Sequence, residues 1–226
     1  RTPMSTPYTV DLFCRVIDNF GDAGVCLRLA RALVLRHGMA LRLWCDDVPL
    51  LTRLEPHPAA GLSFHDWAAH AGATPADGVV CGFGCTLDEA YLRAMAARKP
   101  QPAYIHLEYL SAEPWVETTH GLWSTHPRLG LRQRFCSPGF TPVTGGLLRE
   151  PAAYDEALGL QTLRDLAAQH GCGAVPADTP RVFVFAYPTP AFDAFIAAAQ
   201  SLTQPMHWVL PQGAAGQAFY DAMQSR

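Results

Sequence analysis

The stretch "CRVIDNFGDAGVCLRLARAL", residues 14–33, predicts a strand that runs through a glycine turn into a helix. Many α/β proteins bind a phosphate at such a turn, because the helix begins with unpaired N–H groups. Here the turn carries two carboxylates, Asp18 and Asp22. Negative charge repels a phosphate, which raises the question of what this turn binds.

Segments of strand and helix character alternate around this stretch. The alternation predicts an α/β fold with a parallel sheet covered by helices. The predicted segments are residues 8–17 (strand), 24–37 (helix), 40–47 (strand), 77–86 (strand and glycine turn), 87–100 (helix) and 102–110 (strand).

The second half of the chain changes in character. Residues 110–150 are dense in glycine, proline and aromatic residues and show no clear period, which is typical of functional loops. An Ala- and Leu-rich helical stretch follows, and strand, helix and strand then recur from residue 181. The sequence therefore predicts a first Rossmann-like domain at 1–170, a linker at 171–180 and the beginning of a second domain at 181–226.

Composition excludes several classes of protein. The chain has 226 residues, 49% apolar and 16% charged, with a formal net charge of -3, which is typical of a globular protein. Such a charge gives no general electrostatic attraction to nucleic acid or to a membrane surface. Arginine supplies nearly all the positive charge, since Lys99 is the one lysine in the sequence. No apolar run reaches the length of a membrane span, and no signal peptide is recognisable.

The seven cysteines lack CxxC spacing. Cys14, Cys45 and Cys81 lie in strand-like apolar runs, where a thiol packs as a small hydrophobe. This pattern predicts a reducing, cytoplasmic location. A zinc site is an alternative, although its spacing fits no standard pattern; its ligands would be Cys81, Cys85, His106, His120 and His126.

The first glycine turn has two simple interpretations. A dinucleotide-binding turn needs GxGxxG and an acid after the second strand, and Asp46 and Asp47 stand at that place. However, the glycines are Gly21 and Gly24 with two residues between them, and the carboxylate of Asp22 would repel the pyrophosphate.

The second simple interpretation is a helix cap, a role that one aspartate could fill. Two carboxylates at the carboxyl end of a central strand indicate a site instead, because α/β sheets bind ligands in that crevice. Such a pair could bind a metal, hold a cation or act as a base.

Four motifs resemble one known family. They are "VIDNFGDAGVCLRLAR" (16–31), "LRLWCDD" (41–47), "HLEYLSAEPWVETTHGLWSTHP" (106–127) and "FCSPGFTPVTGGLLRE" (135–150). Their order and wording resemble the bacterial arginine rhamnosyltransferases that modify translation elongation factor P, the EarP family, over most of residues 8–150. One departure is His106, where the family pattern has asparagine.

The resemblance implies a GT-B type glycosyltransferase with two Rossmann-like domains. Such an enzyme transfers L-rhamnose from dTDP-β-L-rhamnose, with inversion, to one arginine in the N-terminal domain of elongation factor P, and it needs neither a metal nor a cofactor. The amino-terminal half binds the protein acceptor, and the carboxyl-terminal half binds most of the nucleotide sugar.

The resemblance also implies residue roles. Asp18 and Asp22 are catalytic, with Asp22 the general base, and Asn19 and Gly21 line the sugar. Two carboxylates suit a cationic guanidinium, which they can hold by charge-assisted hydrogen bonds. The implied donor-binding residues further along the chain are Phe185, Tyr187, Gly145 and Gly146, and the implied acceptor-binding residues are Glu108, Tyr109 and Glu113.

Several alternatives stay open. Phe185 could instead pack in a core strand, the glycine pair could form an ordinary turn, and Glu113 could simply stabilise its loop. The family's diphosphate-binding motif is expected beyond residue 226, so this polypeptide could be a non-catalytic binding module for elongation factor P. A nucleotide-dependent oxidoreductase is the remaining alternative.

Overall fold

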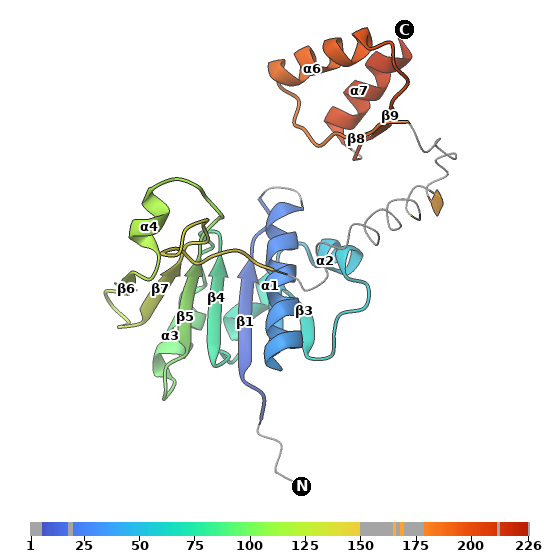
Figure 1. Cartoon of the computed structure of the whole chain (residues 1–226). Helices are drawn as coiled ribbons and strands as arrows, with labels where there is room; N and C mark the ends of the chain where they lie inside the picture. Colours follow the sequence, from blue (N-terminus) through green and yellow to red (C-terminus); the bar gives the residue numbers. More distant parts are fainter. Residues whose placement is uncertain are drawn as a thin grey trace. The chain divides into compact units, whose positions relative to one another are not determined.

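The computed structural model describes residues 6–17, 20–149, 165, 168–169, 179–211 and 213–225. The chain divides into two compact units, Arg1–Ala153 and Tyr154–Arg226 (Figure 1). The predicted linker, 171–180, lies almost wholly outside the described residues, and the predicted domain boundaries therefore stay predictions.

Unit 1 is built on a seven-stranded sheet of order β3-β2-β1-β4-β5-β7-β6. All neighbouring strands are parallel except β6, which runs antiparallel to β7 at one edge. The predicted α/β fold with a parallel sheet is confirmed. The strands are β1 Thr9–Cys14, β2 Ala40–Cys45, β3 Leu62–Asp66, β4 Gly78–Gly82, β5 Ala103–Leu107, β6 Trp123–Thr125 and β7 Arg132–Cys136.

Helices cover both faces of this sheet. One face packs against α1 and α2, and the other packs against α3 and a short 3-10 helix, η1 (Figure 1). Their bounds are α1 Gly21–His37, α2 Val48–Leu54, η1 Trp67–Gly72 and α3 Glu89–Ala97; a short helix, α4 Trp115–Thr119, lies in the loop region after β5.

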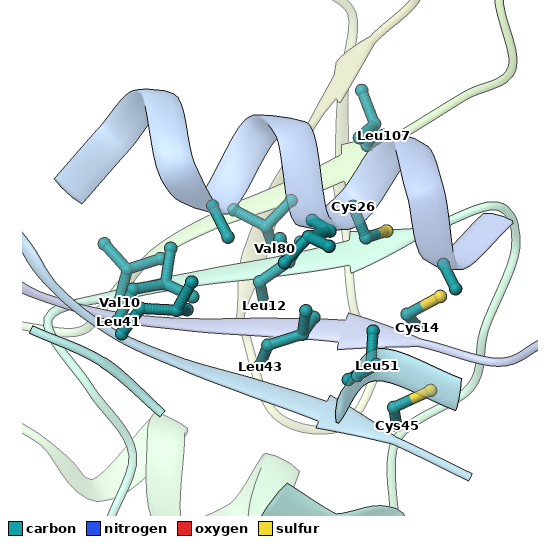
Figure 2. Packing of buried hydrophobic residues seen from close by; sticks show 14 of the residues in the cluster. Val10, Leu12, Cys14, Cys26, Leu41, Leu43, Cys45, Leu51, Val80 and Leu107 are labelled. Carbon is teal, nitrogen blue, oxygen red and sulfur yellow. The ribbon is translucent and has the colours of Figure 1, made fainter. Parts of the chain in front are cut away.

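Helix α1 forms because its apolar residues recur at helical spacing. The buried side chains of Ala23, Cys26, Leu27, Ala30 and Val34 pack on β1, β2 and β4 (Figure 2). The helix then ends at a left-handed glycine, Gly38, whose N–H donates to carbonyls of the last turn. Since the opposite face buries Phe13, Trp44 and Tyr91, the central strands are apolar on both sides, as parallel sheets require.

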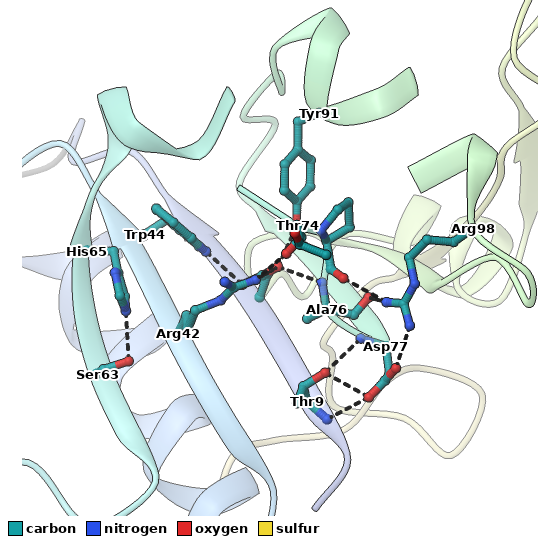
Figure 3. A network of polar contacts seen from close by, with 12 residues as sticks. Thr9, Arg42, Trp44, Ser63, His65, Thr74, Ala76, Asp77, Tyr91 and Arg98 are labelled. Carbon is teal, nitrogen blue, oxygen red and sulfur yellow. Dashed lines mark hydrogen bonds and ion pairs between the residues drawn. The ribbon is translucent and has the colours of Figure 1, made fainter. Parts of the chain in front are cut away.

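One buried carboxylate interrupts this apolar sheet. Asp11 on β1 is 0% exposed and accepts hydrogen bonds from Arg42 Nε at 2.6 Å and Nη2 at 2.8 Å, from Trp44 Nε1 at 2.8 Å, from Ala76 N at 2.9 Å and from Tyr91 Oη. Figure 3 shows these donors on β2, on α3 and, for Ala76, on the segment before β4. Every donor is on a neighbouring segment, so the network joins strands to the helix that covers them.

Residues 110–150 were expected to form a long loop, but the structure has regular elements there. The region contains α4, β6 and β7, and β7 extends the parallel sheet beside β5. Strand β6 could not be predicted from the sequence because its three residues are all exposed. Strand β7 could not be predicted because Arg132, Gln133 and Arg134 break the apolar pattern of a strand. Helix α1 also begins at Gly21, three residues before the predicted start at residue 24.

Unit 2 contains the predicted strand, helix and strand. Strands β8 (Arg181–Phe183) and β9 (His207–Val209) are parallel, and α6 (Pro190–Ser201) connects them before α7 (Ala214–Gln224). The buried core consists of Phe192, Ile196, Ala199 and Phe219. No helix in the described parts of the chain is long and apolar enough to cross a membrane.

Candidate functional site

The carboxyl ends of four neighbouring parallel strands form one edge of unit 1. Strands β1, β4, β5 and β7 pair in that order, so the loops that follow them emerge at the same edge. From β1 the chain continues to β2 on one side, and from β4 it continues to β5 on the other. The carboxyl ends of the neighbouring strands β1 and β4 therefore mark the topological switch point, where α/β sheets bind ligands.

Asp22 lies at this switch point in the first turn of α1. Its side chain is 2% exposed, and its Oδ2 accepts a hydrogen bond from the backbone N–H of Ile17 at 2.8 Å. Phe20 occupies the N-cap position of α1, and its side chain makes no capping hydrogen bond. Asp22 lies two residues further on, inside the helix, and is therefore not the N-cap residue. The positive end of the helix stabilises a carboxylate here. Asp18 and Asn19, predicted beside it, lie outside the described residues.

Buried thiols lie beneath this turn. Cys14, Cys26 and Cys45 are each 0% exposed, which confirms that Cys14 and Cys45 pack as small hydrophobes (Figure 2). A hydrogen bond with Cys26, burial and the negative charge of Asp22 all raise the pKa of Cys14. A thiol with a raised pKa stays protonated, so Cys14 is neither a nucleophile nor an anionic ligand at neutral pH.

The two acids after β2 support loops. Asp46 Oδ1 accepts a hydrogen bond from the N–H of Val16 at 2.9 Å and so fixes the loop between β1 and α1. Asp47 caps α2, with its Oδ1 2.9 Å from the N of Leu50. Neither role was predicted, since both residues were considered only as ribose ligands. The signal for Asp47 was available, because Asp47-Val48-Pro49 is a typical start of a helix.

The second glycine turn follows β4. The N–H of Cys85 donates to the carbonyl of Gly82 at 3.2 Å, and the two central residues have positive φ angles, 54° at Phe83 and 73° at Gly84. The N–H of Phe83 donates to Leu107 O at 2.7 Å, which joins the turn to the end of β5. Sequence reasoning did not single out Phe83, and the aromatic residue between two glycines was the only signal.

The three predicted acceptor-binding residues follow β5 at the same edge. Glu108 Oε1 lies 3.1 Å from His106 Nε2, so the residue that departs from the family pattern contacts a predicted site residue. The ring of Tyr109 stacks on that of Phe83, with centroids 4.3 Å apart and planes 13° apart. Glu113 is exposed and its carbonyl accepts from Val116 N at 3.2 Å at the start of α4.

The glycine pair after β7 shows one clear constraint. A Cβ on Gly145 would lie 3.1 Å from the carbonyl oxygen of Ser137 and 3.2 Å from Cys136 Sγ, so only glycine fits without displacement. Gly146 has a φ of 71° and open space around it. The glycine at 145 is therefore explained by packing within its own loop, and its predicted approach to the donor stays a prediction.

Comparison with known proteins decides the family. A sequence model described as "Elongation-Factor P (EF-P) rhamnosyltransferase EarP" matches residues 10–226. The chain belongs to the EarP family. A relative from Pseudomonas putida, named protein-arginine rhamnosyltransferase, is 43% identical over 218 residues, which cover 91% of this chain and 57% of that protein.

Further EarP relatives agree. A protein-arginine rhamnosyltransferase from Neisseria meningitidis is 38% identical over 154 residues, covering 64% of this chain and 39% of that protein. A solved structure described as the "structural basis for EarP-mediated arginine glycosylation of translation elongation factor EF-P" has a TM-score of 0.53 and 27% identity, covering 96% of this chain and 54% of the other. The chain thus spans little more than half the length of the curated EarP relative from Pseudomonas putida.

The two residues of unit 2 that were predicted to bind the donor line an open hollow. Phe185 and Tyr187 are 65% and 50% exposed, and their rings meet edge to face at 6.1 Å. The alternative that Phe185 packs in a core strand is wrong, since β8 ends at Phe183. The hollow has a volume of about 570 Å³, and it is lined by residues 182–187 with Thr189, Ala191, Phe192 and Phe195.

No cluster of metal ligands accompanies these residues. Within the described ranges, no three or more His, Cys, Asp or Glu side chains are arranged to hold a metal ion. The zinc alternative therefore has no support in the described structure, while the prediction that the reaction needs no metal stays a prediction.

Proposed function

We propose that this chain carries the acceptor-binding domain, and the beginning of the donor-binding domain, of an inverting GT-B type arginine rhamnosyltransferase. Its donor would be dTDP-β-L-rhamnose, and its acceptor one arginine in the N-terminal domain of elongation factor P. The EarP match over residues 10–226 supports this reaction. Among the structural observations, the buried carboxylate of Asp22 at the switch point carries the proposal furthest.

The chemistry explains why a carboxylate is needed at that place. Guanidinium is cationic, with a pKa above about 12, so removing its proton before attack would be costly. The proton therefore leaves for Asp22 as an arginine nitrogen forms its bond to the anomeric carbon. The bond from that carbon to the diphosphate oxygen breaks at the same time, and dTDP departs from the opposite face with its electron pair.

The position of Asp22 suits this role. A group held by α1 and by the backbone of Ile17 has a fixed orientation before the substrate arrives, which reduces the cost of alignment. In the proposed site, Asp18 is the second carboxylate, while Asn19 and Gly21 line the sugar. A negative carboxylate also stabilises the positive charge that develops on the sugar in the transition state.

The other predicted residues divide between the two substrates. Glu108, Tyr109 and Glu113 would contact the acceptor protein from the loop after β5. On the donor side, Phe185 and Tyr187 would contact the thymine from the hollow in unit 2, and Gly145 and Gly146 would approach the sugar. We also propose that the reaction uses no metal or cofactor, that neither nucleic acid nor membrane is a partner, and that the protein acts in the cytoplasm.

The test is the intact mass of elongation factor P after incubation with the chain and dTDP-β-L-rhamnose. The expected result is a gain of one deoxyhexose that the Asp22→Asn variant does not produce. If Asp22→Asn kept near-normal turnover while binding both substrates, the base would have been assigned to the wrong residue.

A second candidate function follows from the share of the relatives that the chain spans. At 57% of the length of the Pseudomonas putida relative, this polypeptide could bind the acceptor without transferring sugar. Retention of elongation factor P by the immobilised chain, with no gain in mass, would support this binding module. Failure of both measurements would overturn the two functions together. Family membership argues against the oxidoreductase alternative.

A further inference from the structure

Phe83 combines a bulky side chain with a backbone conformation that disfavours it. Among the described residues it is the one non-glycine residue with a positive φ, 54°. With Gly84 at 73° it forms the centre of a type I′ turn, where glycine, asparagine and aspartate are the usual residues. Because the turn would form more easily with one of those residues, the phenyl ring must serve through its contacts.

The ring of Phe83 has two neighbours of different kinds. On one side it belongs to the buried cluster beneath α1, which includes Ala23 and Cys26, and the residue is 8% exposed. On the other side it stacks nearly parallel on Tyr109, at 4.3 Å and 13°. Tyr109 itself remains 47% exposed, so Phe83 connects the core to an aromatic ring at the surface.

The stacked pair lies beside the helix that carries Asp22. Gly82, immediately before Phe83, approaches α1 so closely that a Cβ there would lie 3.2 Å from Cys26 Sγ. Cys26 is four residues after Asp22 and therefore one helical turn further along α1. Strands β1 and β4 are adjacent, so the carboxylate and the ring pair occupy the two sides of the switch point.

We propose that Phe83 is a positioning residue, which holds the ring of Tyr109 as a platform for the guanidinium group of the acceptor arginine. This inference deepens the proposed function and rests on it. Guanidinium is planar and stacks on aromatic faces, while its N–H groups point outward in the same plane. A ring under the plane and the carboxylate of Asp22 at its rim would fix both the position and the orientation of the attacking nitrogen.

The competing explanation is that Phe83 only fills the core. The two roles separate in variants of the same position. Phe83→Leu keeps an apolar side chain but removes the flat face that supports Tyr109, whereas Phe83→Tyr keeps the face. Phe83→Asn suits the turn better than phenylalanine but has no ring. A core role ranks these variants by apolar volume, and a platform role ranks them by aromaticity.

The experiment titrates the chain with the small probe Nα-acetyl-L-arginine methylamide and follows the ring signals of Tyr109 by NMR. The expected result is a saturable shift of those signals, and a much smaller one with the matching lysine derivative. In Phe83→Leu and Phe83→Asn the affinity for the probe should fall roughly fivefold, the size of a cation–π contact, while Phe83→Tyr keeps it.

Two results would overturn the proposal. One is an unchanged affinity in folded Phe83→Leu, with thermal stability as the only property that changes. The other is the absence of any response of Tyr109 to the arginine probe. Since the probe is not elongation factor P, a normal response together with no binding of the whole factor would reject the proposed function and leave the platform intact.

Discussion

Two buried carboxylates, one in β1 and one at the start of the next helix, differ in what surrounds them. Asp11 accepts hydrogen bonds from Arg42, Trp44, Tyr91 and the backbone of Ala76, all on regular elements or the segments that join them (Figure 3). Asp22 accepts a hydrogen bond from Ile17, in the loop at the carboxyl edge of the sheet.

The difference indicates where in this fold a buried carboxylate is placed to meet a ligand. Asp11 is enclosed by side chains of the sheet and of α3, so its charge is compensated inside the protein and serves to join these two layers. Asp22 is equally buried but lies where four loops leave the sheet, at the place where α/β proteins bind ligands. Burial alone does not separate the structural carboxylate from the proposed catalytic one; the position relative to the carboxyl ends of the strands does.

The largest expected effect tests the first half of this comparison. Asp11→Ala should lower the free energy of unfolding by about 3–5 kcal/mol, because it leaves a partly buried guanidinium and several buried donors without their acceptor. Urea unfolding measures the loss. Arg93→Ala, which breaks an exposed ion pair with Glu89 within α3, is the control and should cost less than about 0.5 kcal/mol. A loss below about 1 kcal/mol for Asp11→Ala would contradict the structural role.

A smaller change in stability is expected at the second carboxylate. Asp22→Asn can still accept the hydrogen bond from Ile17, and it loses the interaction of its charge with the helix end, which is worth about 0.3–1 kcal/mol. In the proposed reaction, transfer to elongation factor P should nevertheless fall about 100-fold or more, as expected when the proposed general base is removed. The same urea titration, beside the mass assay, checks both numbers. If Asp22→Asn were as unstable as Asp11→Ala, the comparison would fail, since both residues would be structural.

The smallest expected effect concerns Asp77, at the amino end of β4. Hydrogen bonds from Arg98 and Thr9 lower the pKa of Asp77 to about 2. Since the folded value lies below the ordinary value near 4, these bonds stabilise the protein above about pH 4, and the gain disappears as the pH falls toward 2. The carboxylate is partly exposed, so the gain should be only a few tenths of a kcal/mol.

The measurement for Asp77 is the thermal midpoint of the chain and of Asp77→Asn across this pH range. The two midpoints should differ above about pH 4 and converge in stronger acid. A constant difference at all pH values would show that the charge of Asp77 contributes nothing.

Much of the fold could be predicted because the central elements carry strong periodic signals. The predicted strand 8–17 and the predicted helix 24–37 are apolar at strand and helix spacing, and both elements are present, as β1 Thr9–Cys14 and α1 Gly21–His37. Strand β7 could not be predicted, since it is held by its pairing with β5 and not by its own composition. The role of Asp11 could not be predicted for a related reason. A single acid in an apolar run does not indicate that donors from distant segments will form five hydrogen bonds with it.

The candidate site was predictable to a similar degree. The turn motif placed Asp22 at the carboxyl end of a central strand, where the structure has it. By contrast, the stacking of Phe83 on Tyr109 joins residues from different loops, and it depends on a backbone angle that sequence patterns do not encode. The roles assigned to the site residues came from family resemblance, and they stay predictions until the variants are measured.

The position of Lys99 has a practical consequence. It lies between the end of α3 and the beginning of β5, and thus at the edge of the sheet opposite to the loops of the candidate site. As the sequence has no other lysine, coupling of a side-chain amine to a solid support would attach unit 1 by that edge. In molecules attached through Lys99, the carboxyl edge with Asp22 and Tyr109 would then face the solution, so the candidate site would stay accessible to a partner.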